Sequence, residues 1–147
     1  MTVTTRHTDA APTAVWDVLA DGWLYPLWVV GAARMREVDD SWPAVGSRLH
    51  HSVGLWPVLL DDTTSVLACD PGHHLELKAR AWPAGTAKVG IELRPAGGDT
   101  DIVMEEHPAD GPATMIPEPV TAPLLRWRNV EALRRLAALA EGRGGPA

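Results

Sequence analysis

Polar and apolar residues alternate along the middle of the chain. Leu49, His51 and Val53 fall on one face of an extended segment. Arg48 and His50 fall on the other face. The same period of two continues downstream and predicts half-buried antiparallel strands, which pack one face on a core. The expected strands are Val3–Thr8, Arg34–Val38, Ser47–Val53, Trp56–Leu67, His74–Ala81, Ala87–Arg94 and Thr100–His107.

Helical spacing of apolar residues appears towards the two ends of the chain. Thr13–Ala20 is expected to be a helix, with Pro12 at a first position that tolerates proline. Gly22 is expected to end it in a left-handed conformation, and Trp23–Val30 to form a second short helix. Pro123–Glu141 is predicted as one long amphipathic helix. The apolar stripe expected to face the sheet comprises Trp127, Val130, Leu133, Leu136, Ala137 and Ala140.

Short turn sequences connect the predicted strands. Asp70–Gly72 and Ala96–Asp99 both contain glycine where a tight turn needs positive φ. Strands that follow one another through such turns favour a meander. His107–Ala122 contains four prolines and little periodicity, and is predicted to be a loop or crossover.

Composition limits the classes of function. The chain has 147 residues, which suits a single domain over 1–142 with a disordered tail over 143–147. The net charge of −6 argues against nucleic acid as a partner, because phosphate binding needs clustered Lys and Arg. No apolar run is long enough for integral membrane association, and no secretory signal is evident. A cytoplasmic location is therefore expected, and the oligomeric state is left open.

The order of motifs resembles one superfamily over nearly the whole chain. A polar strand leads into Ala-Pro and a helix bearing Trp16, and then into the Tyr25–Trp28 segment. An Asp70-Pro71 turn precedes a strand, and a closing helix carries Asn129, two leucines and Glu141. This order resembles the START/Bet v 1-like superfamily, especially its polyketide cyclase/dehydrase and lipid-transport branch.

The resemblance implies an α+β helix-grip fold. A curved antiparallel sheet would wrap around the long C-terminal helix, two short N-terminal helices would close one edge, and a cavity would lie between sheet and helix. The implied function is binding of a hydrophobic or aromatic small molecule, lipid- or polyketide-like, without a cofactor. An aromatase/cyclase-type enzyme acting on a polyketide is the alternative, and a protein-interaction module is the third. Fold alone does not decide among them.

Two polar residues are candidates for acid/base chemistry. His51 shares a strand face with apolar neighbours, so its imidazole would contact a ligand or exchange a proton if that face lines a cavity. One of Glu105 and Glu106 must also point inward, and strand parity groups Glu106 with Ile102 and Met104. An inward carboxylate near His51 would form an acid/base pair. Each candidate also has a purely structural interpretation. His51 would then bond a backbone carbonyl, and Glu105 and Glu106 would be solvated carboxylates at a strand end.

The remaining candidates are apolar or aromatic. The seven tryptophans are the unusual feature of the composition, since large rings either fill a core or line a cavity. The six histidines show no metal-ligand spacing, so no metal site is expected. The expected cavity lining comprises Trp23, Tyr25, Trp28, Leu49, His51, Val53, Trp56, Trp127 and Val130.

Overall fold

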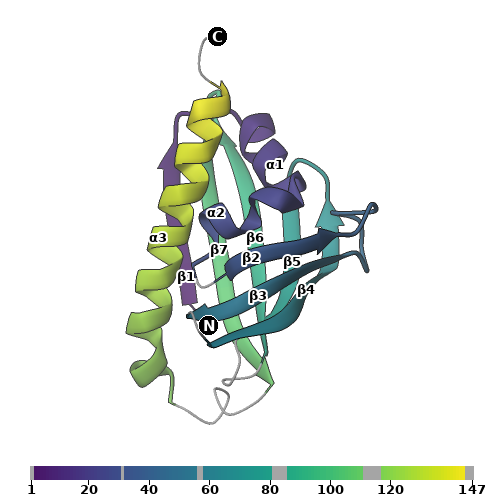
Figure 1. Ribbon diagram of the computed structural model, residues 1–147. Coiled ribbons are helices and arrows are strands. Elements are labelled where there is room, and N and C mark those ends of the chain that lie inside the picture. The colour runs from purple at the N-terminus through teal and green to yellow at the C-terminus, as the bar shows by residue number, and fades with distance from the viewer. Residues whose placement is uncertain (1, 31, 56–57, 81–85, 111–116, 145–147) are drawn as a thin grey trace.

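Seven strands and four helical segments make up the part of the protein that the structure describes. The structure, a computed structural model, describes residues 2–30, 32–55, 58–80, 86–110 and 117–144. The strands, labelled in Figure 1, are β1 (Thr2–Thr8), β2 (Ala32–Val38), β3 (Arg48–Leu55), β4 (Val58–Asp70), β5 (His74–Arg80), β6 (Thr86–Ala96) and β7 (Asp99–Asp110). The helices are α1 (Pro12–Ala20), the 3₁₀ turn η1 (Gly22–Leu24), α2 (Tyr25–Trp28) and α3 (Glu118–Gly144).

All the strands belong to one antiparallel sheet. Its order is β1-β7-β6-β5-β4-β3-β2, so β2 to β7 form a meander and β1 pairs with β7. Glycines occupy the tight turns, with φ of 82° at Gly72, 60° at Gly97 and 96° at Gly98. An L side chain rarely adopts such φ values, which is why these turns need glycine. The predicted meander is confirmed.

The helices cover the concave face of the sheet. Figure 1 shows α3 running alongside β1, while β2 and β3 cross the direction of β7 steeply, so the sheet twists strongly from one end to the other. α3 contacts β1, β7, α1 and α2. Buried apolar side chains from the sheet, α1, α2 and α3 form one core. The helix-grip prediction is therefore confirmed, and the helices lie on the side of the sheet where this core forms.

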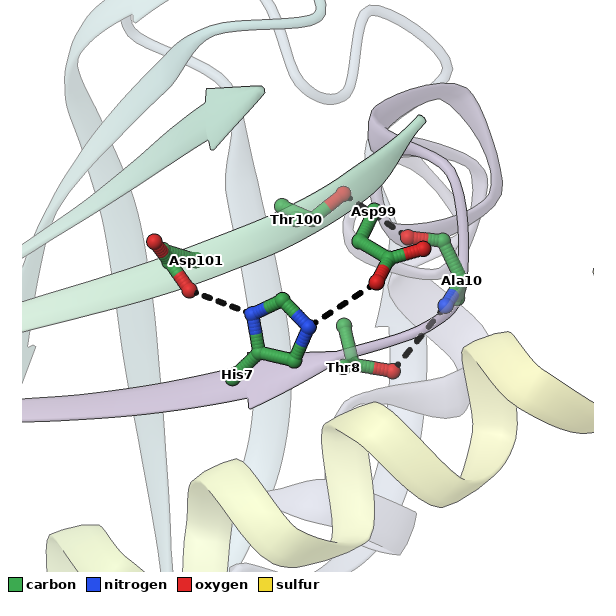
Figure 2. Close-up of polar contacts among 6 residues, drawn as sticks. All are labelled: His7, Thr8, Ala10, Asp99, Thr100 and Asp101. Atoms are coloured by element: carbon green, nitrogen blue, oxygen red, sulfur yellow. Dashed lines mark hydrogen bonds and ion pairs between the residues drawn. The ribbon is translucent and has the colours of Figure 1, made fainter. Parts of the chain in front are cut away.

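Hydrogen bonds hold the short connection between β1 and α1 in place (Figure 2). The Ala10 N–H donates to Thr8 Oγ1 at 3.2 Å, and Thr100 Oγ1 donates to the Ala10 carbonyl at 2.8 Å. On the outer face, His7 Nδ1 lies 2.7 Å from Asp101 Oδ1 and His7 Nε2 lies 3.0 Å from Asp99 Oδ2. Paired ring nitrogens favour the charged imidazole, so these bonds raise the pKa of His7, with Asp101 the larger cause and Asp99 the second.

The C-terminal helix is longer than its apolar pattern predicts. It begins at Glu118, so the last five residues of the predicted loop 107–122 are helical. Pro119 lies in the first turn, where the missing N–H has no helical partner in any case. The helix also continues through Gly142 to Gly144, which corrects the predicted tail; residues 145–147 lie outside the described chain. A glycine near a helix end costs about 1 kcal/mol but need not stop the helix.

The predicted apolar stripe of α3 is confirmed at Leu133, Leu136, Ala137 and Ala140, which are buried, but not in the preceding turns of the helix. Trp127 is 62% exposed and Val130 is 48% exposed, so the prediction that they face the sheet is wrong. Asn129 is buried instead, and at 3.6 residues per turn Trp127 lies about 160° around the helix from it. The face that packs on the core comprises Asn129, Ala132, Leu133, Leu136, Ala137 and Ala140.

Contrary to the prediction, Gly22 does not end the first helix but begins η1. Its φ is not positive; α1 ends at Ala20, and Asp21 follows in extended conformation. A Cβ at residue 22 would lie 2.5 Å from Leu49 Cδ2 and 2.8 Å from Val38 Cγ1. Both distances are too short for real carbon contacts, so glycine allows η1 to pack directly on the sheet.

Candidate functional site

A buried cluster of three polar side chains lies on the concave face of the sheet. We call His51, Thr64 and Tyr25 the central cluster. His51 Nε2 lies 2.8 Å from Thr64 Oγ1, and the Tyr25 hydroxyl lies 3.2 Å from the same oxygen. His51 is 2% exposed, Thr64 is 0% exposed and Tyr25 is 4% exposed.

Strand register brings His51 and Thr64 together. Thr64 on β4 pairs directly with Leu49 on β3, two residues before His51 and on the same face. Diagonal neighbours of this kind lie within side-chain reach. The predicted parity is confirmed: Leu49 and His51 point inward, Arg48 is exposed, and His50 is half-buried on the other face, where it bonds Asp39.

The third member of the cluster comes from α2. The Tyr25 ring stacks on His51, with centroids 5.4 Å apart and planes 27° apart, and Trp28 lies edge-on to Tyr25 with centroids 5.4 Å apart. The Asp21 carboxylate accepts the Trp23 N–H at 3.2 Å and so fixes the start of η1. The short helices therefore place an aromatic wall over the two polar strand residues.

The Thr64 hydroxyl joins the other two groups chemically. A threonine hydroxyl has one hydrogen and two lone pairs. It can donate to only one of its two neighbours, so at least one neighbour donates to it. The imidazole and the phenol are thus linked through a single oxygen, and a proton shift at one end of the cluster changes the bonding at the other.

Glu106 lies in a different place. It is 3% exposed on β7, and its carboxylate pairs with the Arg128 guanidinium of α3. Three strands separate β7 from β3, and no described hydrogen bond or ion pair joins Glu106 to His51. Glu106 is the inward carboxylate and Glu105 is exposed. The predicted His51–carboxylate pair is therefore not formed.

The sequence matches the family model for polyketide cyclase/dehydrase and lipid transport over residues 2–141. The chain belongs to this family. Among curated protein sequences no match was found. Within the described ranges, no helix of this family member has both the length and the apolar character that a membrane crossing requires.

Solved structures share the fold of this polyketide cyclase/dehydrase and lipid-transport family member. A protein from Nitrosomonas europaea has a TM-score of 0.72 and 15% identity, covering 96% of this chain and 94% of its own. Ara h 8.0201 has a TM-score of 0.71 and 12% identity, with 95% and 96% covered. The di-domain ARO/CYC StfQ from the steffimycin biosynthetic pathway has a TM-score of 0.74 and 13% identity; the match covers 98% of this chain and 51% of StfQ. These neighbours are Bet v 1-like folds.

The predicted cavity residues separate into three groups. Tyr25, Trp28, Leu49 and His51 are buried on the concave side of this family member. Trp23 is 57% exposed and borders an open surface cleft of about 380 Å³ with Trp42 and several aspartates, so it does not point inward. Trp127 and Val130 are exposed on α3, as described above. Trp56 and the side chain of Val53 lie outside the described residues.

Thr64 is the site residue that the sequence pattern does not predict, although its parity with Val66 places a hydroxyl at an apolar position of β4.

Two further observations on this family member concern a cysteine nucleophile and a metal site. Burial raises the pKa of the Cys69 thiol, which disfavours the thiolate that a nucleophile needs. The described His, Cys, Asp and Glu side chains form no group of three that could hold a metal ion.

Proposed function

We propose that the protein binds a hydrophobic or aromatic small molecule, lipid- or polyketide-like, between the curved sheet and α3. The proposal treats residues 1–142 as one ligand-binding domain acting in the cytoplasm. The observation that carries it is the central cluster. Three polar side chains are held together among core residues, on the side of the sheet that the helices cover.

The cluster suits a ligand with a large apolar body and a polar group. Ligand sites are mostly apolar, with a few placed polar groups that orient the ligand. The stacked Tyr25 and His51 rings, with Trp28 edge-on to Tyr25, offer flat apolar surface. The hydroxyl and imidazole beside that surface offer hydrogen bonds.

Native mass spectrometry of the purified protein tests the proposal first, because a retained ligand adds a defined mass. A thermal-shift screen of flat polycyclic compounds and fatty acids follows. Ligand at 100 times its Kd stabilises the folded state by about 2.7 kcal/mol, which is readily measured. No retained mass and no shift with any compound would contradict the proposal and favour a protein-interaction module.

Two adjacent histidines provide a matched pair of variants. His51→Gln alters the central cluster, while His50→Gln alters the opposite face of β3. We expect His51→Gln to lower the affinity of a polar polycyclic ligand about tenfold, the value of one hydrogen bond in a buried site. We expect His50→Gln to leave that affinity unchanged. Equal effects of the two variants would exclude the central cluster as the binding site.

The bridging hydroxyl favours one second function, an aromatase/cyclase-type enzyme. An aldol cyclisation removes a proton from the carbon next to one carbonyl, forms a carbon–carbon bond to a second carbonyl carbon, and protonates that second oxygen. Loss of water then gives the unsaturated ring. The imidazole and the phenol, linked through Thr64, are both side chains of the kind that serve as general acids and bases in enzymes.

A direct assay separates carrier from cyclase. A linear poly-β-carbonyl thioester would be incubated with the protein and the aromatic product followed by its absorbance. A cyclase predicts faster product formation with wild-type protein than with buffer, and loss of that rate in His51→Gln while the thioester still binds. A carrier predicts binding with no change in product or rate.

A further inference from the structure

A second buried polar region lies where β1 and α3 meet. We call Thr4, Arg6, Glu106, Arg128 and Asn129 the β1–α3 seam. Glu106 pairs by register with Thr2 on β1 and bonds Arg128 on α3, so the strand pair and the helix are in contact at this level. Thr4 and Arg6 continue along the inward face of β1, opposite Met104 and Ile102. Asn129 follows Arg128 and is 3% exposed.

Three buried polar atoms in the β1–α3 seam have no hydrogen-bond partner among the described residues: Thr4 Oγ1, Arg6 Nε and Asn129 Nδ2. Buried polar groups are nearly always paired, and an unpaired one destabilises the folded state. Arg6 Nε and Asn129 Nδ2 can only donate, and the Thr4 hydroxyl can donate or accept. What the seam lacks is an acceptor.

The charges of the seam indicate which acceptor fits. The carboxylate of Glu106 is paired with the guanidinium of Arg128. Arg6 is only partly exposed, and no described carboxylate pairs with it. One positive charge therefore remains on the inward face of β1. Guanidinium groups bind carboxylates with strong, charge-assisted hydrogen bonds.

We propose that the β1–α3 seam binds the carboxylate of an apolar acid, which receives hydrogen bonds from Arg6 Nε, Asn129 Nδ2 and the Thr4 hydroxyl. This inference rests on the proposed function and narrows its ligand to a chain or ring system that ends in a carboxylate. The carboxylate replaces the missing acceptor and balances the charge of Arg6. An ordered water would satisfy the donors but would leave the charge unbalanced.

Two probes of equal chain length test the inference. Dodecanoate and dodecanol differ only at the polar end, and their affinities are measured by displacement of Nile red. Hydrogen bonds to charged groups are worth enough to separate the two by about tenfold or more. We expect dodecanoate to bind the wild-type protein at least about tenfold more tightly than dodecanol.

Arg6→Met should abolish this preference by weakening dodecanoate and leaving dodecanol unchanged. Arg126→Met, which removes an equal charge from an exposed position of α3, should preserve the preference. Asn129→Leu provides a second readout. It should weaken dodecanoate while keeping or raising the unfolding midpoint in urea, because it removes a buried donor that lacks a partner.

Each contrary result overturns the inference. Equal binding of dodecanoate and dodecanol, unaffected by Arg6→Met, would show that the seam holds only water, while binding itself would still support the proposed function. Failure of dodecanoate to bind would also overturn the carboxylate assignment, and the polycyclic screen would then judge the proposed function separately. A lower unfolding midpoint for Asn129→Leu would show that Asn129 is a bonded structural residue.

Discussion

Two polar regions are buried on the same face of the sheet, and they differ in how their groups are paired. In the central cluster, one threonine oxygen bonds both the imidazole of His51 and the phenol of Tyr25. In the β1–α3 seam, Glu106 and Arg128 pair with each other, but buried atoms of Arg6 and Asn129 have no described partner. The central cluster is thus built mostly from internal bonds, whereas the seam is incomplete.

The two regions should therefore respond differently to substitution. An internally bonded cluster stabilises the fold and holds its groups in place for a ligand, so a change within it should lower stability as well as ligand affinity. A buried group without a partner costs stability until a ligand supplies that partner. Changes at the unpaired seam residues Arg6 and Asn129 should therefore appear mainly in ligand affinity. The variants below test the contrast from its largest expected effect to its smallest.

Thr64→Val should have the largest effect on stability. Valine keeps the shape of threonine but removes the hydroxyl that bonds both His51 and Tyr25, and Thr64 is completely buried. Each buried polar group left without a partner costs about 1–3 kcal/mol, so we expect a loss of about 2–4 kcal/mol. Urea unfolding followed by tryptophan fluorescence measures it.

Thr5→Val is the control for this change. Thr5 is exposed on β1, where the same substitution should change stability by less than about 0.5 kcal/mol. If Thr64→Val were no more destabilising than Thr5→Val, the central cluster would not be a stabilising network. The contrast with the seam would then be lost.

Glu106→Gln should have an intermediate effect, and Glu105→Gln is its natural control. Glu106 is buried and paired with Arg128, while its neighbour Glu105 is exposed on the other face. Losing one partner of a buried pair is costly, but the Arg128 side chain is 32% exposed and can turn towards water. We expect a loss of about 1–2 kcal/mol for Glu106→Gln and almost none for Glu105→Gln. Denaturant midpoints at neutral pH measure both, and equal midpoints would show that the Glu106–Arg128 pair adds nothing to stability.

Most of the fold could be predicted because its signals are local. The period of two along the strands and the glycine turns give the meander, and they also give the inward direction of Leu49 and His51. The sequence pattern fails where packing overrides a local rule. The prolines predict no helix before residue 123, although the first turn of a helix accepts proline. The pattern predicts a left-handed Gly22, although its small size is what the contact with Leu49 requires.

The candidate site was less predictable because its contacts join distant segments. Tyr25 and Thr64 are 39 residues apart, and only the packing of α2 on the sheet brings them together. The stripe of α3 is predicted correctly from Leu133 onwards but not before it, because Trp127 and Val130 are apolar and Asn129 is polar, which is the reverse of their burial. An asparagine on the buried side of a helix is visible in the sequence only as an interruption of the stripe. Whether such an asparagine stabilises the fold or binds a ligand depends on the residues packed against it, which the sequence does not show.

The smallest expected effect concerns the outer face of β1, where His7 is the neighbour of Arg6. His7 is bonded by Asp101 and Asp99, which raise its pKa above the ordinary 6.5. A raised pKa in the folded state means that the pairing contributes full stability below the unfolded pKa and loses it as pH rises through the folded pKa. We therefore expect His7→Gln to lower the urea midpoint more at about pH 5.5 than at about pH 8.5. The effect should be small and should shrink with added salt, because these side chains are exposed.

His73→Gln, at an exposed histidine outside any described ion pair, should show no such dependence on pH. If the difference in urea midpoint between wild-type protein and His7→Gln is the same at both pH values, the interaction of His7 with Asp99 and Asp101 does not depend on a protonated imidazole.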